Sequence, residues 1–191
     1  VCDASLSASD DVELVREIAP EPREVTEQYV EQILPVATPL FQFGFKGVDE
    51  GYGNNILEQV SGEIVCDIIA GESSLLYRRL YDEGLINATF GSETLAGRGY
   101  LSTVFSGESR DPKRVADEIT KEIQKLSEFG IPAEDFSRAK RACYGRYIGI
   151  YSSVEAMAGM MLLAELAEID VYAPLEKLDS ITLNDVQAYL R

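Results

Sequence analysis

The side chains that could carry chemistry in this sequence are few, and none of them is a histidine. Without imidazole, neither a Ser–His–Asp nor a Cys–His nucleophile can form, and a zinc site loses its commonest nitrogen ligand. The three cysteines, Cys2, Cys66 and Cys143, are far apart and show no C-x-x-C spacing, so they predict neither a zinc site nor a disulfide framework. Cys66 and Cys143 have apolar neighbours and are expected to be small core residues.

The remaining nucleophiles and carboxylates also lack partners. Ser73–Ser74 is not part of a G-x-S-x-G elbow and is expected to cap a helix. Lys140 stands with Arg138, Arg141 and Arg146 in a basic run that is expected to be a solvated helix face. No D-x-D-x-D-G pattern indicates a calcium or magnesium site. The chain alone is therefore predicted to be inactive and to hold no metal.

Length and charge exclude further classes. With 191 residues, 46% hydrophobic and 26% charged, the chain fits one large domain, which we place at residues 23–191. Residues 1–22 are expected to be a linker or the tail of a preceding domain, and the start at Val1 suggests a fragment of a longer protein. The 17 basic and 33 acidic residues, net −16, argue against nucleic acid as the main partner.

Two further expectations concern the surroundings of the protein. The longest uncharged apolar run, Ala156–Ala164, is far shorter than the roughly twenty residues of a membrane span, so no membrane contact is expected. The cysteine pattern fits a reducing cytoplasm.

The elements that must position any site follow from hydrophobic periodicity and turn residues. Strands are predicted at residues 25–34, 40–46, 85–95 and 100–106, with residues 96–99 as a hairpin loop between the last two. In the second strand Phe41, Phe43 and Phe45 alternate with other residues and should share one face.

Helices are predicted over these ranges: residues 10–18, 55–70, 74–83, 112–129, 132–147, 154–169 and 183–190. The helix at 154–169 is apolar on several faces and is expected to be well buried. The order of elements predicts an α+β fold: a two-layer sandwich with a four-stranded, mostly antiparallel sheet and its helices on one face.

One stretch carries a family resemblance. Leu75–Phe90, LLYRRLYDEGLINATF, resembles the C-terminal-half motif of the insulinase/pitrilysin-type metallopeptidases, the inverted zincins: a helix written L-x-x-x-L-R, charged residues, then G-L-x-Y leading into a strand. The following strand pair, the Asp111–Pro112 helix start and the long helices also match the layout of that family, so the resemblance covers roughly Val25 to Arg191.

The resemblance implies a division of labour between two homologous halves. One half of such proteins carries H-x-x-E-H, which binds zinc and supplies a glutamate as general base, whereas the other closes over the substrate and usually carries no metal. This chain has no H-x-x-E-H and so resembles the non-catalytic half, with a processing-peptidase-like fold. The resemblance implies that this chain binds no cofactor and that zinc is bound only by a homologous catalytic half or partner chain. It also implies a peptide substrate, and a homo- or heterodimer as one form of assembly.

The same resemblance names the candidate substrate-facing residues. In the family the helix end supplies an arginine and the strand start a tyrosine; these positions fall on Tyr81 and Asn87, so both are substituted. Neither residue carries a fixed positive charge for a developing oxyanion. Arg78 and Arg79, within one turn before Tyr81, are the alternative source of that charge.

Three functions remain open from the sequence. The leading hypothesis is the non-catalytic C-terminal domain of a bacterial zinc-metalloendopeptidase-like hydrolase, forming one wall of a peptide-binding chamber and completing the site of the catalytic half. The second is a catalytically dead structural or assembly subunit of the same family. The third is an unrelated small-molecule enzyme of α+β fold, which is weaker because no polar cluster converges in the sequence.

Overall fold

The computed structural model describes residue 22 and residues 24–47, 56–97 and 100–191. The described part contains an antiparallel sheet of three strands: β1 (Leu40–Lys46), β2 (Gly91–Gly97) and β3 (Tyr100–Glu108). Its helices are α2 (Ile56–Ala70), α3 (Leu75–Asp82), α4 (Pro112–Phe129), α5 (Ala133–Tyr151), α6 (Val154–Ala167), α7 (Ala173–Ser180) and α8 (Leu183–Leu190). The α+β class is confirmed. The expected helix at 10–18, and residues 98–99 of the expected hairpin loop, lie outside the described residues.

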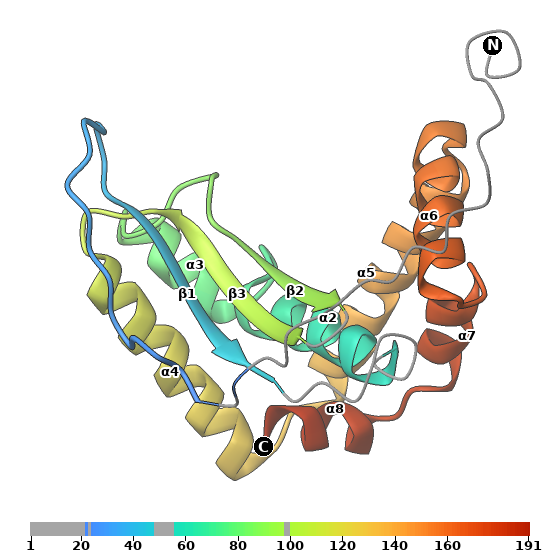
Figure 1. Ribbon diagram of the computed structural model, residues 1–191. Coiled ribbons are helices and arrows are strands. Elements are labelled where there is room, and N and C mark those ends of the chain that lie inside the picture. Colours follow the sequence, from blue (N-terminus) through green and yellow to red (C-terminus); the bar gives the residue numbers. More distant parts are fainter. Residues whose placement is uncertain (1–21, 23, 48–55, 98–99) are drawn as a thin grey trace, which may run out of the picture.

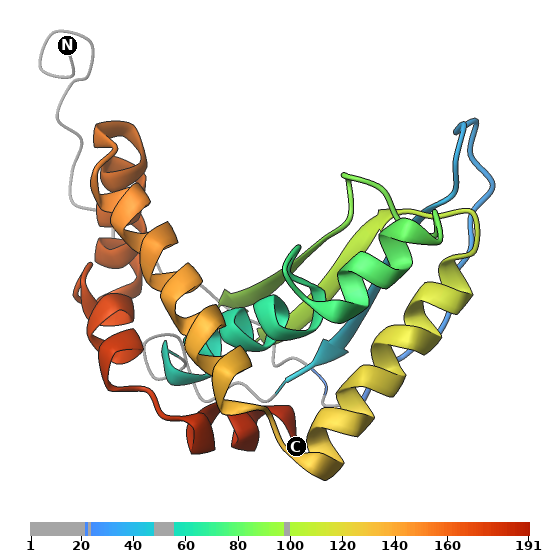
Figure 2. The same ribbon diagram turned by 180° about the vertical axis from the view of Figure 1, so that it is seen from behind.

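Helices α2 and α4 pack against one face of the sheet, as Figures 1 and 2 show from opposite sides. β3 is the central strand, in the order β1-β3-β2, and Phe43 of β1 stands opposite Phe105 of β3. Phe41 and Phe43 pack against the hydrophobic core, and the Phe43 and Phe45 rings meet edge to face at 5.0 Å. Phe45 is 41% exposed but lines a cavity together with residues of α2, α4 and α8, so all three phenylalanines lie on the helix-facing side of β1, as predicted.

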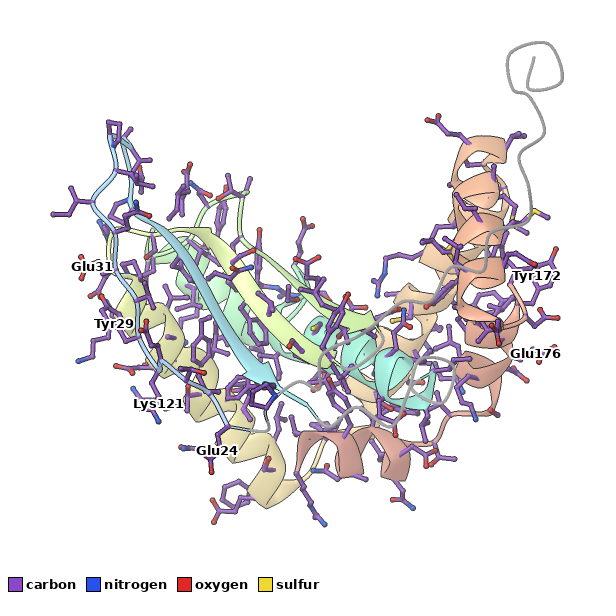
Figure 3. The ribbon with its side chains drawn as sticks, in the orientation of Figure 1. Glu24, Tyr29, Glu31, Lys121, Tyr172 and Glu176 are labelled. Carbon is purple, nitrogen blue, oxygen red and sulfur yellow. The ribbon has the colours of Figure 1, made fainter. Side chains whose placement is uncertain are left out.

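The prediction of a fourth strand at residues 25–34 is wrong for the described chain. This segment has no strand pairing, and the side chains of Val30 and Ile33 are 73% and 96% exposed. Figure 3 labels Tyr29 and Glu31 in this segment and Glu24 just before it, and the Tyr29 hydroxyl donates a hydrogen bond of 2.9 Å to Glu31. Without a buried face, nothing fixes a strand register here.

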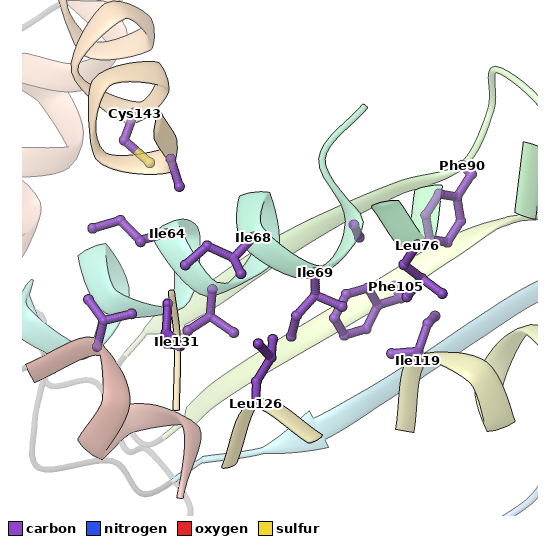
Figure 4. Packing of buried hydrophobic residues seen from close by; sticks show 14 of the residues in the cluster. Ile64, Ile68, Ile69, Leu76, Phe90, Phe105, Ile119, Leu126, Ile131 and Cys143 are labelled. Carbon is purple, nitrogen blue, oxygen red and sulfur yellow. The ribbon is translucent and has the colours of Figure 1, made fainter. Parts of the chain in front are cut away.

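Helix α2 is the centre of the core. Its buried residues face several directions: in Figure 4, Ile64 and Ile68 lie toward Cys143 of α5, whereas Ile69 lies beside Phe105 of β3. Gly62 permits this close packing, because a Cβ at that position would lie 2.5 Å from Thr94 Oγ1 and 2.8 Å from the Tyr189 hydroxyl. Each large side chain buried in this way stabilises the fold by roughly 1.5–3 kcal/mol.

The helix boundaries follow from local capping, as the sequence predicts. Asp111 accepts a hydrogen bond from the Arg114 amide at the start of α4, where Pro112 fills the first turn. Thr182 and Asp185 form a reciprocal capping box at the start of α8. The strand expected from residue 85 begins only at Gly91.

The expectation of a well-buried helix at residues 154–169 is wrong. In α6 only Ala164 and Ala167 are buried, and Met160 is partly buried against the core. Five larger apolar side chains are more than half exposed: Val154, Met161, Leu162, Leu163 and Leu166. α5 and α6 meet at a bend of 100°, which directs α6 away from the sheet (Figure 1). Much of the apolar surface of α6 is therefore exposed in the described chain. No single described helix is long and apolar enough to span a membrane, although the bent α5–α6 pair passes that test by length and composition.

The basic run on α5 is not one solvated face, which corrects the expectation for it. Lys140 Nζ donates to the carbonyl oxygens of Asp179 and Ile181, at 2.8 and 3.0 Å, and so holds the end of α7. Arg138 pairs with Asp135 at 2.6 Å, within its own helix. Each cation is thus directed to a separate partner.

Polar contacts also join α5 to α2. Arg146 pairs with Asp67 at 2.8 Å, and the Tyr147 hydroxyl donates to Glu63 Oε1 at 3.0 Å. Cys66 and Cys143 are buried as expected, and burial raises the pKa of the Cys66 thiol to about 11. Burial likewise raises the pKa of Cys143, so both thiols are protonated and unreactive at neutral pH.

Glu63 makes the stability of this junction depend on pH. Burial raises the pKa of its carboxyl above the ordinary 4.5, so the folded chain holds this proton more tightly than the unfolded chain does. Stability from this group is complete below pH 4.5 and declines as pH rises through the raised pKa. Glu63→Gln keeps an acceptor for Tyr147 but does not titrate, so its free energy of unfolding relative to wild type should rise with pH above 4.5.

Urea unfolding of both chains between pH 4 and 8 measures this difference. Glu128→Gln, at an exposed position on α4, is the control and should show no such trend. A difference that stays flat with pH, or falls, would show that Glu63 is not destabilised in its charged form.

Candidate functional site

The candidate site is built on the turn between α3 and β2. Ser74 begins α3, accepting a hydrogen bond from the Tyr77 amide while its hydroxyl donates to the carbonyl oxygen of Ile69 at the end of α2. Gly84 ends α3 with φ of +64°, a conformation that glycine adopts without the cost of a Cβ. Leu85 and Ile86 are buried directly after it. The predicted helix and its stop at Gly84 are therefore confirmed, whereas a turn, anchored by apolar side chains on both sides, stands where the strand was expected to begin.

Asn87 ties this turn to the end of β3. Its Nδ2 donates to Glu108 Oε2 at 2.8 Å, and its Oδ1 accepts hydrogen bonds from the amide and the hydroxyl of Thr89, at 2.9 and 2.6 Å. The hydroxyl of Thr89 also accepts from the Glu108 amide at 3.1 Å. Asn87 therefore holds the loop against β3, because both the nitrogen and the oxygen of its side-chain amide are hydrogen-bonded.

An open groove of about 550 Å³ lies beside this contact. It is lined by Leu40, Phe41, Gln42, Thr89, Ser106, Gly107 and Glu108. A Cβ at Gly107 would lie 2.9 Å from the Phe90 Cα, so only glycine lets β3 pass this close to the loop. The groove runs along the first residues of β1, which pairs only with β3 within the described chain. Such an edge offers backbone donors and acceptors to an extended peptide.

Tyr81 belongs to a row of aromatic rings. It is half exposed and stacks on Tyr77 with centroids 5.9 Å apart, Tyr77 lies 6.0 Å from Phe90, and Phe90 lies 6.3 Å from Phe41 in the groove. Aromatic contacts of this kind contribute about 0.5–1.5 kcal/mol each beyond their buried area. The row links the end of α3 to the groove.

The two candidate arginines are held by neighbouring segments. Arg79 forms an ion pair of 2.6 Å with Glu118 of α4, and hydrogen bonds from Lys121 and Arg79 lower the pKa of that carboxyl. Arg78 donates to the carbonyl oxygen of Ser73 at 3.2 Å. Neither arginine lines the groove.

Of the four candidate residues, the structure places Asn87 and Tyr81 near the groove but not Arg78 and Arg79. Asn87 reaches the groove-lining Thr89 and Glu108, and Tyr81 reaches it through other rings. Glu108 and Thr89 were not expected from the sequence, since their roles depend on where the loop meets β3. The one available signal was the Asn-x-Thr spacing of Asn87 and Thr89, which fits an Asx turn.

The described residues offer no group of three or more Cys, Asp or Glu side chains that could hold a metal ion. The groove itself presents one carboxylate, from Glu108, with an amide and hydroxyl groups. This set can bind a peptide backbone by hydrogen bonds, but it holds no nucleophile with an adjacent base.

Comparisons with known proteins show which family the chain resembles. A family model described as the peptidase M16 inactive domain matches residues 4–143. The uncharacterized zinc protease YmfH of Bacillus subtilis (strain 168) is 25% identical over 181 residues, which is 94% of this chain and 42% of YmfH.

Solved structures with the same fold include a putative M16-like peptidase from Alicyclobacillus acidocaldarius, with a TM-score of 0.76 and 25% identity over 82% of this chain and 38% of that one. The inactive peptidase domain of a putative zinc protease from Bordetella parapertussis has a TM-score of 0.64 and 19% identity, over 80% of this chain and 82% of that one. The chain therefore spans less than half the length of YmfH and of the Alicyclobacillus protein.

The contact between Asn87 and Glu108 leads to a testable prediction. Asn87→Asp keeps the acceptor for Thr89 but loses the donor to Glu108 and places two carboxylates at hydrogen-bond distance. We expect the free energy of unfolding to fall by about 1 kcal/mol at neutral pH and to recover partly in 1 M salt, because this exposed pair is screened.

Asn87→Ala serves as the comparison, since it removes the same hydrogen bonds without adding charge and should be insensitive to salt. Urea unfolding at low and high salt distinguishes the two variants. Equal salt responses in both would contradict the contact.

Proposed function

The chain belongs to the M16 peptidase family as an inactive domain, and from this premise we propose that it forms one wall of a peptide-binding chamber, completing the site of a homologous catalytic half. The observation that carries the proposal is the groove at the edge strand β1, with Gln42, Thr89 and Glu108 at its surface, in a chain without histidine. The groove supplies binding groups but no catalytic ones.

Zinc, in this proposal, belongs to the other half. A hydrolytic zinc site needs protein ligands that leave one position open for water, and histidines usually supply most of them. This chain contributes hydrogen-bonding positions and shape instead. Glu108 in the groove and the net charge of −16 favour peptides with basic side chains.

Helix α6 supports an extensive contact with the rest of such a protein. Met161, Leu162, Leu163 and Leu166 are each more than half exposed, and adjacent exposed apolar side chains of this size commonly mark an interaction surface. The relatives with longer chains have the additional length to cover it. We propose that the homologous half, in the same chain or in a dimeric partner, packs on α6.

The alternative function is a catalytically dead assembly subunit. Tyr81 and Asn87 favour this alternative, because they replace the arginine and the tyrosine that the family resemblance implies at these positions. Tyr81 stacks on Tyr77, and Asn87 is hydrogen-bonded to Thr89 and Glu108. For either function we propose a bacterial protein, since the relatives named above are bacterial. We further propose a reducing cytoplasm, with which the free, buried Cys66 and Cys143 are compatible.

Zinc content and peptide hydrolysis of the full-length parent, with this chain alone as the control, test the function. We expect stoichiometric zinc and cleavage in the parent and neither in the chain. Absence of both from the parent would leave the assembly subunit as the function. Zinc-dependent cleavage by the chain alone would contradict the proposal.

A paired substitution tests the α6 contact. Leu162→Gln with Leu166→Gln removes apolar surface one helical turn apart from exposed positions, so the free energy of unfolding of the chain alone should change by less than about 0.5 kcal/mol. In the parent the same pair should lower thermal stability and hydrolysis.

Leu75→Gln is the matched control, because Leu75 is an 81% exposed leucine on α3. It should leave both properties of the parent unchanged. A parent that tolerates the α6 pair as well as the control would show that α6 is not covered.

A further inference from the structure

A second cavity, of about 620 Å³, lies at the opposite end of β1 from the groove, between the sheet and helices α2, α4 and α8. Most of its lining is apolar and comes from both layers: Phe45, Leu57, Val65, Ile69, Leu101, Phe105, Ile123 and Leu190. Its volume is that of a small-molecule site, for which roughly 300–1,000 Å³ is usual. Nothing in the peptide-binding proposal uses it.

Two polar groups at this cavity have no partner within the described chain. The Ser61 hydroxyl, in a residue only 1% exposed, makes no hydrogen bond, and neither does the buried Oε2 of Glu58. They lie three residues apart on α2 and therefore share one face of that helix. Leaving such a group buried and unpaired costs about 1–3 kcal/mol each, and such groups are rare in folded proteins.

A third polar position completes the same end of the cavity. The hydroxyls of Tyr189 and Thr103, which both line it, are hydrogen-bonded to each other at 2.7 Å. A Cβ at Gly62, the neighbour of Ser61, would lie 2.8 Å from the Tyr189 hydroxyl, so this hydroxyl lies against α2. Burial raises the pKa of Tyr189. The cavity thus combines apolar walls with three hydroxyls and two carboxylates, of which Asp185 already accepts hydrogen bonds from Thr182 whereas Glu58 has an unpaired oxygen.

We propose that this cavity binds a primary ammonium compound with an apolar body. An ammonium group carries three donors, which match the unpaired oxygen of Glu58, the Ser61 hydroxyl and the Tyr189–Thr103 pair. The carboxylate favours a cation and repels an anion. Two cationic residues also line the cavity, but they do not cancel this preference for a cationic ligand. Lys46 donates a hydrogen bond to the carbonyl oxygen of Pro22, and Arg191 is exposed.

The apolar walls determine the rest of the ligand. Phe45 and Phe105 lie on the sheet side, and the aliphatic Val65 and Ile69 lie on the helix side. An aryl or alkyl chain between these walls leaves water and gains roughly 25 cal/mol per Å² of buried apolar area. A phenylalkylamine fits both ends of the cavity.

Titration of the chain with 4-phenylbutylamine, followed by methyl NMR, tests the proposal. We expect saturable shifts of the Val65, Ile69 and Leu101 methyl groups, with those of Leu162 and Leu163 on α6 unchanged. 4-Phenylbutanol should bind at least tenfold more weakly, and 4-phenylbutanoate more weakly still. No cavity shifts at millimolar amine, or equal binding of the carboxylate, would overturn the proposal.

Variants locate the ammonium. Glu58→Gln should weaken amine binding at least tenfold while leaving the affinity for 4-phenylbutanol unchanged, and Ser61→Ala should weaken amine binding severalfold. Unchanged alcohol binding shows that the variant cavity is still folded. Glu128→Gln, at an exposed position on α4, is the matched control. If Glu58→Gln binds the amine as Glu128→Gln does, the ammonium is not at Glu58 and the proposal fails.

Discussion

The burial of α2 is the constraint on which the rest of the structure depends. Val60, Ile64 and Ile69 on this helix are 0–1% exposed, although they face different directions. A helix that is apolar on several sides has to be covered on several sides, here by the sheet and by α5, α7 and α8. Both the groove and the cavity follow from it, because the end of α2 fixes α3 through Ser74, and its first turns carry Glu58 and Ser61.

The sequence predicts the local features of this fold well because their causes are local. The α3 cap at Ser74, the stop at Gly84 and the Asp111–Pro112 start each depend on neighbouring residues, so pattern alone locates them. The α+β class follows from the order of such elements. The same locality explains why the Leu75–Phe90 stretch is enough to indicate the family.

The failures share a different cause. An apolar pattern indicates that a segment can pack against another surface, but it does not identify that surface. Residues 25–34 have no strand partner in the described chain, and α6 is largely exposed rather than buried. The site shows the same limit, since the Asn87–Glu108 contact depends on how a loop meets a strand 21 positions away. The sequence nominates Tyr81 and Asn87 as substrate-facing residues, which stays a prediction, and their contacts with Tyr77, Thr89 and Glu108 emerge only from the three-dimensional structure.

The central claim is that this chain supplies surface and the other half supplies chemistry. The most direct measurement adds the purified chain to the rest of the parent protein, expressed separately, and follows peptide hydrolysis and zinc content. The claim predicts that the remainder of the parent binds zinc in the absence of this chain but cleaves peptide slowly. Addition of the chain should increase the rate of hydrolysis until one molar equivalent has been added. Full hydrolysis by the remainder without the chain, or zinc bound by the chain itself, would contradict it.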